Sequence, residues 1–290
     1  MTAALPGFDS QYADLPEYIL KCTNQIWESR DIAAIEWHYD DNIQIRTPIT
    51  YAEGNRAGIT NTMETLYEFP DRQLFGEDVI WSEHADFGYL SSHRIISEAT
   101  HLQDGVFGPA SGKKLRFRTI ADTNCIDNAV HEEWLVRDVG AMARQIGDHP
   151  RTMAAKIIEA EGGPTKAKRP FTPAADKPGR YKSRGNDNEW GQKATALLER
   201  IMRAEFSAVV DTYDRGCHLA YPGGVSAHST APAEAFWLGL RSSFPDATFG
   251  VDHAIGREDP MLPPRAAIRW HLTGKHSGWG TFGAPTGAEI

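Results

Sequence analysis

Alternating apolar and polar positions in the first half of the chain predict a series of β-strands. They span Phe75 to Ser82, Tyr89 to Thr100, Lys114 to Ile126 and Ala129 to Asp138. Asp127 and Asn128 are suited to a tight hairpin turn between the last two strands. A shorter strand, Asn42 to Thr47, comes earlier and is stopped by Pro48. Strands linked by hairpins predict a mostly antiparallel sheet.

Helical spacing of apolar residues precedes these strands. The broken stripe from Leu15 to about Tyr39 predicts two short helices, hinged near residues 29–31. Ile59 to Phe69 predicts a third helix, which Pro70 ends, and Val139 to Ile146 predicts a short closing helix. Helices followed by a run of strands are typical of the α+β class.

The same pattern returns in the second half of the chain. Ser92 to Gly112 matches Ala267 to Gly287 at an offset of 175 residues, and Phe69-Pro70-Asp71 matches residues 244–246 at the same offset. The repeat predicts the helices Lys193 to Asp214 and Pro232 to Phe244 around the strand His218 to Tyr221. A period of this length indicates tandem domains rather than a solenoid.

The repeat therefore predicts a first domain at residues 12–150 and a second at residues 190–290. The first copy continues for 35 residues after Gly112, to Gly147, whereas three residues follow Gly287. We expect the second domain to lack its last strands. Residues 151–189 read as a polar, solvated linker, with an arm packed over a neighbouring domain as the alternative.

Composition narrows the function classes. The chain has 290 residues, 41% hydrophobic and 24% charged, and a net charge of −9, which argues against a general nucleic-acid binder. It has no apolar run long enough to cross a membrane and no signal-peptide pattern in its first 16 residues. Three cysteines without metal-type spacing predict free thiols, no metal site and a cytoplasmic protein.

Several motifs together resemble one family. Ala99-Thr100-His101 is followed by Gly108-Pro109-Ala110-Ser111-Gly112, and Trp134 and Asp138 share the last strand. This pattern is similar to the SnoaL-like polyketide cyclase branch of the nuclear-transport-factor-2-like superfamily. The resemblance implies two tandem cone-shaped α+β barrels, each a curved sheet wrapped around helices with an apolar pocket. It also implies that the two domains pack together as a pseudo-dimer, with a homodimer as a further possibility.

The resemblance implies a cofactor-free enzyme that acts on a hydrophobic carbonyl compound by general acid/base chemistry. Enolisation, aldol-type ring closure and isomerisation belong to this class, which is that of an isomerase or lyase. A non-catalytic small-molecule-binding or dimerisation module of the same fold is the alternative. Epoxide hydrolysis would need an Asp-Arg-Asp cluster that the sequence does not identify.

Three residues are candidate catalysts. His101 recurs as His276, and histidine is the residue type suited to proton transfer, although each His also suits a role in fixing the loop after its strand. Asp138 and Asp122 are candidate buried carboxylates, with loop fixing or an arginine partner as the alternative. Members of this family usually have an acidic residue near the end of the last strand, and only Asp138 or Glu133 can take this position here.

Aromatic and histidine side chains supply the candidate substrate contacts. These are Tyr39, Trp37, Phe107 and Trp134 in the first domain, and His276 and Trp270 in the second. Along the last strand, the side of Trp134 is the more apolar, so we expect it to face inward. Arg94 and Glu83 both recur, which favours an ion pair between them, with binding of an anionic substrate by Arg94 as the alternative.

Overall fold

A computed structural model describes residues 5–290 of the chain. Residues 1–4, which belong to the stretch tested for a signal peptide, lie outside this description. The chain forms two compact units, Met1–Lys182 with Pro222–Gly224, and Ser183–Tyr221 with Val225–Ile290. Each unit is described by itself.

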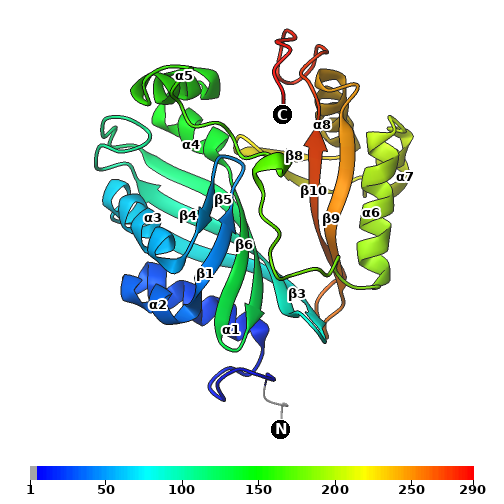
Figure 1. The fold of residues 1–290 in the computed structure, drawn as a ribbon. Coiled ribbons are helices and arrows are strands. Elements are labelled where there is room, and N and C mark those ends of the chain that lie inside the picture. The colour runs from blue at the N-terminus through cyan, green and yellow to red at the C-terminus, as the bar shows by residue number, and fades with distance from the viewer. Residues whose placement is uncertain (1–4) are drawn as a thin grey trace. The chain divides into compact units, whose positions relative to one another are not determined.

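The first unit is an α+β fold built on one six-stranded sheet (Figure 1). Its strands are β1 (Tyr39–Arg46), β2 (Tyr51–Glu53), β3 (Gln73–His84), β4 (Gly88–Thr100), β5 (Lys114–Ile126) and β6 (Ala129–Arg137). The spatial order is β2-β1-β6-β5-β4-β3. Strands β1 and β6 run parallel and the other neighbours antiparallel, which confirms the predicted mostly antiparallel, curved sheet. The β5–β6 turn uses Asp127 and Asn128 at φ 50° and 63°, the left-handed conformation that a tight hairpin requires.

Helices precede and follow the strands of the first unit. They are α1 (Leu15–Thr23), the π-helical turn η1 (Asn24–Glu28), the 3₁₀ turn η2 (Ile32–Ala34), α2 (Ile35–His38), α3 (Asn55–Glu68), α4 (Val139–Ile146) and α5 (Pro150–Ala160). Asp14 caps α1 by accepting from the Glu17 amide, and Pro16 occupies its first turn. The break between η1 and η2 confirms the predicted hinge, whereas α3 begins four residues earlier than its apolar stripe indicated.

The second unit follows the first part of this order of elements. It contains α6 (Glu189–Met202), α7 (Ser207–Thr212), β7 (His218–Tyr221), β8 (Val225–His228), α8 (Thr230–Ser243), β9 (Thr248–Arg257) and β10 (Arg265–Thr273). Strands β7 and β8 pair antiparallel, as do β9 and β10. The single helix predicted from Lys193 to Asp214 is wrong, because the chain turns at Ala204, with φ 66°, and starts a new helix at Ser207.

The loop after β4 has the same local structure as the loop after β10. His101 Nδ1 lies 3.0 Å from Ser111 Oγ, and His276 Nδ1 lies 3.1 Å from Thr286 Oγ1. In both loops the glycine amide at the end donates to the carbonyl of the His, at 2.9 Å in each case (Gly112 and Gly287). The sequence repeat thus corresponds to a repeated backbone structure in this region.

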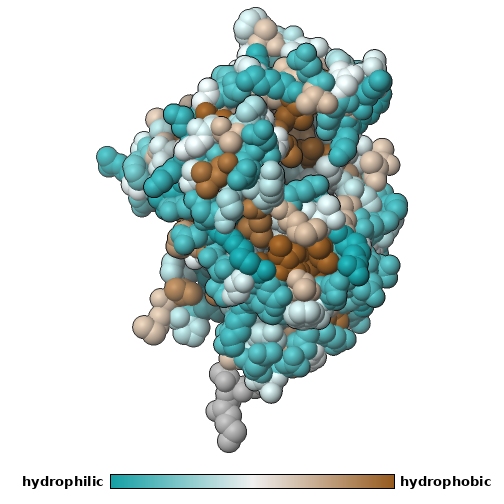
Figure 2. Space-filling view, turned by 90° about the vertical axis from the view of Figure 1, so that its left-hand side faces the viewer, coloured by the Kyte–Doolittle hydropathy of each residue, from teal (hydrophilic) through white to brown (hydrophobic). Residues whose placement is uncertain are grey.

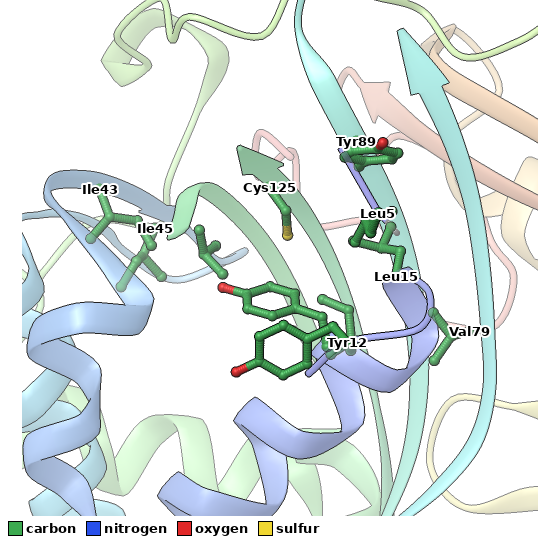
Figure 3. Packing of buried hydrophobic residues seen from close by; sticks show 11 residues of the cluster. Leu5, Tyr12, Leu15, Ile43, Ile45, Val79, Tyr89 and Cys125 are labelled. Atoms are coloured by element: carbon green, nitrogen blue, oxygen red, sulfur yellow. The ribbon is translucent and has the colours of Figure 1, made fainter. Parts of the chain in front are cut away.

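Two apolar clusters fill opposite ends of the helix-facing side of the first sheet. One includes Leu15 of α1 together with Val79, Tyr89 and Cys125, all of which are labelled in Figure 3. The other lies at the far end of β4 and β5 and includes Phe69 and Phe117. Burial of large apolar side chains at both ends holds the helices on this face of the sheet.

The segment before residue 183 packs on the opposite face of the first sheet. Arg46 and Glu132 form a buried ion pair at 2.9 Å, with 4% and 2% of their side chains exposed. Asp176 accepts from Arg46 at 2.6 Å, and the amide of Tyr181 donates to Glu132 at 2.7 Å. This part of the predicted solvated linker is therefore an ordered arm over the first unit.

That arm overturns the predicted orientation of β6. Trp134 lies against Tyr181, with ring centroids 6.3 Å apart, and under the Arg46 guanidinium at 5.1 Å. Glu133 is paired with Ile45 of the apolar cluster and faces the helices instead. The alternation along β6 was predicted with the faces reversed, because the sequence gives no sign that an arm covers the outer face.

The predicted partner of Arg94 is also wrong. Arg94 Nε lies 3.3 Å from Glu77 Oε2, and Arg118 Nε contacts the same oxygen at 2.6 Å. The β3–β4 register places Glu83 opposite Tyr89, at the other end of the hairpin. A register shift between Gly76 and Asp78 brings Glu77 beside the arginines.

Candidate functional site

The helix-facing side of the first sheet is polar in its middle. Strand register aligns Ile95, Thr119 and Arg137 in one row across β4, β5 and β6. The next rows contain His93, Ala121 and Leu135, and then Ser91, Thr123 and Glu133. Because both ends of this face are apolar, buried polar side chains between them indicate a site rather than ordinary core.

A groove of about 610 Å³ borders this polar middle section at His93 and Ile95. Its outer lining is charged or polar and comes largely from α1 and η1, including Glu17, Lys21 and Asn24. Its inner end is formed by His93 and Ile95 of β4 together with Leu20, Leu74 and Gly76. A volume of this size accommodates a small organic molecule.

Gly76 keeps the inner end of the groove open. A Cβ atom at this position would lie 2.8 Å from Leu20 Cδ2 and 3.3 Å from His93 Nε2. Any larger residue would therefore displace Leu20 or press on His93.

Glu133 has the properties of a general base. Its side chain is 9% exposed and lies on the inner face of β6, opposite Thr123. Burial raises the pKa of Glu133 from 4.5 to about 7, although the positive charge of Arg137 opposes the rise. A carboxyl group that titrates near neutral pH can exchange a proton with a bound molecule in either direction.

Tyr39 and Arg137 are the charged or polar neighbours of Glu133 that bear on its chemistry. Burial raises the pKa of Tyr39 well above its ordinary value, and the charge of Glu133 adds to this rise. Arg137 lies four residues beyond Glu133 on the same face, and burial lowers its pKa against the opposing effect of Glu133. The phenol and the guanidinium are both hydrogen-bond donors to a carbonyl oxygen.

His93 is a buried neutral imidazole at the inner end of the groove. It is 2% exposed, and burial lowers its pKa from 6.5 to about 4, partly opposed by Asp78. Within residues 5–290 its Nε2 atom has no hydrogen-bond partner. A buried nitrogen without a partner beside a groove is available to a ligand.

The predicted catalytic residues lie apart from this section. His101 is fully buried, with Nδ1 bonded to Ser111 of its own loop and Nε2 3.2 Å from Glu68 Oε1 at the end of α3. Asp138 caps α4 by accepting from the Ala141 amide at 2.9 Å. Asp122 is 8% exposed and lies opposite Trp134, on the outer face. The structure does not bring the three together, and their catalytic roles stay predictions.

The predicted substrate contacts divide in the same way. Tyr39 lies with Glu133, whereas Trp37 is 55% exposed on the surface. Phe107 packs edge-on against Phe69, in the apolar cluster at the far end of the sheet. In the second unit, His276 bonds Thr286, and Trp270 packs on the core of that unit. A role in binding substrate stays a prediction for each of them.

Sequence reasoning missed Arg72 and Arg137 and placed Glu133 second to Asp138. A signal for Glu133 and Arg137 was present, because they alternate with Leu135 on one face of the last strand, whereas no such pattern marks Arg72. Charged residues with this spacing on an inward face indicate a polar interior, but the choice of face was reversed.

Three further properties of the described residues concern membrane spans, metal ligands and the molecular surface. No helix in residues 5–290 has the length and apolar character needed to cross a membrane. In the same range, no cluster of three or more His, Cys, Asp and Glu side chains is arranged to hold a metal ion. Large hydrophobic side chains at the surface are separated by polar ones over most of the face in Figure 2.

Residues 17–146 match the family model described as SnoaL-like polyketide cyclase. The match covers a little under half of the chain and includes every strand of the first unit. No curated protein matches the sequence.

Solved structures similar to the chain cover its first half. A provisionally assigned SnoaL-like polyketide cyclase from Jannaschia sp. CCS1 is 16% identical, with a TM-score of 0.41, over 47% of this chain and 92% of that one. AclR from Streptomyces galilaeus, provisionally a hydroxylase, is 19% identical, with a TM-score of 0.40, over 46% and 98%. IdmH from Streptomyces antibioticus, provisionally a polyketide cyclase, is 17% identical, with a TM-score of 0.40, over 46% and 99%.

Proposed function

We propose that the first unit is a general acid/base enzyme of the polyketide cyclase type, acting on a hydrophobic carbonyl compound. The observation that carries the proposal is Glu133, a buried carboxyl group with a pKa of about 7 in the polar section that the groove borders at His93. The family match over residues 17–146 supports the same class of reaction. The proposed chemistry needs side chains alone.

In the proposed reaction, the Glu133 carboxylate removes a proton from the carbon next to a carbonyl group. The electron pair of the broken C–H bond moves to the carbonyl oxygen and gives an enolate, to which the Tyr39 hydroxyl donates. The enolate carbon then forms a C–C bond with a second carbonyl carbon of the same molecule. Protonated Glu133 returns its proton to the new alkoxide, so the carboxylate is regenerated and ring closure is redox-neutral.

The first half of this reaction can be tested without the natural substrate. We expect the protein to accelerate the exchange of the acidic C–H protons of 2-tetralone in D₂O, followed by ¹H NMR. The rate should rise with pH to a plateau, with a midpoint near 7, because only the carboxylate form of Glu133 accepts a proton.

Glu133→Gln should lower the exchange rate by about 10²-fold or more, the usual contribution of a general base. Glu98→Gln is the matched control, because Glu98 lies on β4 with half of its side chain exposed and paired with Arg116. His101→Ala tests the earlier candidate in the same assay. Exchange that survives in Glu133→Gln would contradict the proposal, and loss in His101→Ala alone would return the role to His101. Binding of 2-tetralone without any exchange would instead favour a non-catalytic binding module.

A further inference from the structure

Arg72 is a buried cation without a carboxylate partner in the described part of the chain. Its side chain is 2% exposed and lies over the rings of Trp27 and Phe117, at 4.5 and 5.5 Å from their centroids. Nε and Nη2 lie 3.3 and 3.1 Å from Ser97 Oγ, and Nη1 has no hydrogen-bond partner within residues 5–290.

Two more buried polar atoms without partners lie on the neighbouring strands of the same face. They are Thr119 Oγ1 on β5 and Arg137 Nε on β6, and strand register places these residues opposite each other. Phe117, which contacts Arg72, precedes Thr119 by two residues and therefore shares its face. A hydroxyl group and two guanidinium groups thus converge on one part of the inner wall.

The larger charge effects on Arg72 come from other arginines. Burial lowers the pKa of Arg72 well below its ordinary value, and the charges of Arg137 and Arg30 lower it further, against a smaller opposing effect of Glu28. Glu28 is engaged elsewhere, since its carboxylate accepts from the Leu74 amide at 2.5 Å. Buried like charges with unused donors are unfavourable unless an anion neutralises them.

We propose that Arg72 and Arg137, with the Thr119 hydroxyl as a third donor, bind a carboxylate group of the ligand. Guanidinium groups present paired N–H donors that match the two oxygens of a carboxylate. Resting on the proposed function, this assigns the substrate class as a hydrophobic carbonyl compound that carries a carboxylate. The site would hold that carboxylate at one end of the polar section and leave the acidic C–H near Glu133.

A matched pair of probes tests the anion site directly. Isothermal titration calorimetry on the full chain compares 2-naphthoate with 2-naphthamide, its neutral analogue of nearly equal shape. We expect the wild type to bind 2-naphthoate at least about tenfold more tightly, the lower limit for charged hydrogen bonds of this kind. Equal affinity for the two probes in the wild type, or no binding of either, would overturn the proposal without any variant.

Variants then test which residues cause the preference for 2-naphthoate over 2-naphthamide. Arg72→Gln and Arg137→Gln should each reduce it to less than about twofold, because each removes one guanidinium group. Arg116→Gln is the control, since Arg116 lies on β5 with two thirds of its side chain exposed, and it should keep the full preference. Arg72→Lys, which preserves the charge but not the paired donors, replaces Arg72→Gln if the latter does not fold. A preference that persists in the Arg72 and Arg137 variants would refute the assignment.

The outcome can be separated from that of the proposed function. Glu133→Gln should still prefer 2-naphthoate, because binding of the carboxylate does not require proton transfer. A Glu133-dependent exchange of 2-tetralone without a 2-naphthoate preference would reject the anion site and leave the proposed function standing. The preference without any exchange would reject the proposed function and leave the anion site standing.

Discussion

Replacing Glu133 by Gln should stabilise the protein at alkaline pH. In the unfolded chain the carboxyl group titrates near 4.5, and in the folded protein at about 7. Folding therefore favours the protonated form, and between these two values the folded state holds a proton that the unfolded state has lost. The contribution of this group to stability is complete below pH 4.5 and declines as the pH rises through 7.

The size of this effect follows from the pKa rise. Each pKa unit corresponds to about 1.4 kcal/mol, so the loss between pH 4.5 and pH 8 is about 3 kcal/mol. Glu133→Gln has no ionisable group at this position and keeps the shape of the side chain. We expect the variant to match the wild type near pH 4.5 and to exceed its free energy of unfolding by about 3 kcal/mol at pH 8.

Urea unfolding at several pH values between 4.5 and 8.5 measures this difference. Because the chain has two units, the transition of the first is followed by hydrogen exchange of amides in β4 and β5. Glu98→Gln serves again as the control, because Glu98 is a strand residue of the same sheet whose carboxylate is half exposed. A Glu133→Gln difference that does not change with pH would refute the assignment of the raised pKa to this residue.

Three further predictions concern other polar groups. The wild type should lose stability as the pH falls from 6.5 toward 4, because the folded protein resists protonation of the His93 imidazole. His93→Gln should not show this loss, and acid unfolding of the two proteins measures the difference. Glu132→Ala should destabilise the first unit by about 3–5 kcal/mol, because it removes the carboxylate that is paired with the buried Arg46. Since the Tyr181 amide also loses its acceptor, limited proteolysis should cut residues 163–182 faster than in the wild type. Unchanged cleavage would contradict the packing of the arm on the first unit. Ser111→Ala and Thr286→Ala should cost similar amounts, about 1 kcal/mol each, in thermal unfolding, because each removes one bond to a repeated His; unequal costs would argue against equivalent loops.

Much of the first unit could be predicted from the sequence because its signals are local. Alternation gave the strands of the main sheet, and the pair Asp127-Asn128 gave the hairpin between β5 and β6. Val139 to Ile146 was predicted with the bounds it has in the structure. Element type depends on periodicity and turn chemistry, which neighbouring residues carry.

The site depended on information that is not local. Whether the Glu133 or the Trp134 side of β6 faces inward is decided by which face the helices cover and which the arm covers. Arg72 follows a helix and a turn, and only the folded structure places it between Trp27 and Phe117. The partner of Arg94 depended in turn on a register shift that a linear pattern does not reveal.

The repeat separates what the two units share from what they do not. The loop is shared: His101 and His276 make the same hydrogen bond, and the alignment by 175 residues extends through both. The polar inner wall is not shared. At the same offset, Arg72, His93 and Ser97 correspond to Ala247, Ile268 and Leu272. The recurring loop has the same local structure in both units, whereas polar groups buried in the first unit alone need a separate reason. That reason is the chemistry proposed for the first unit, so substitutions in the repeated loop should change stability and those in the inner wall should change proton exchange and carboxylate binding.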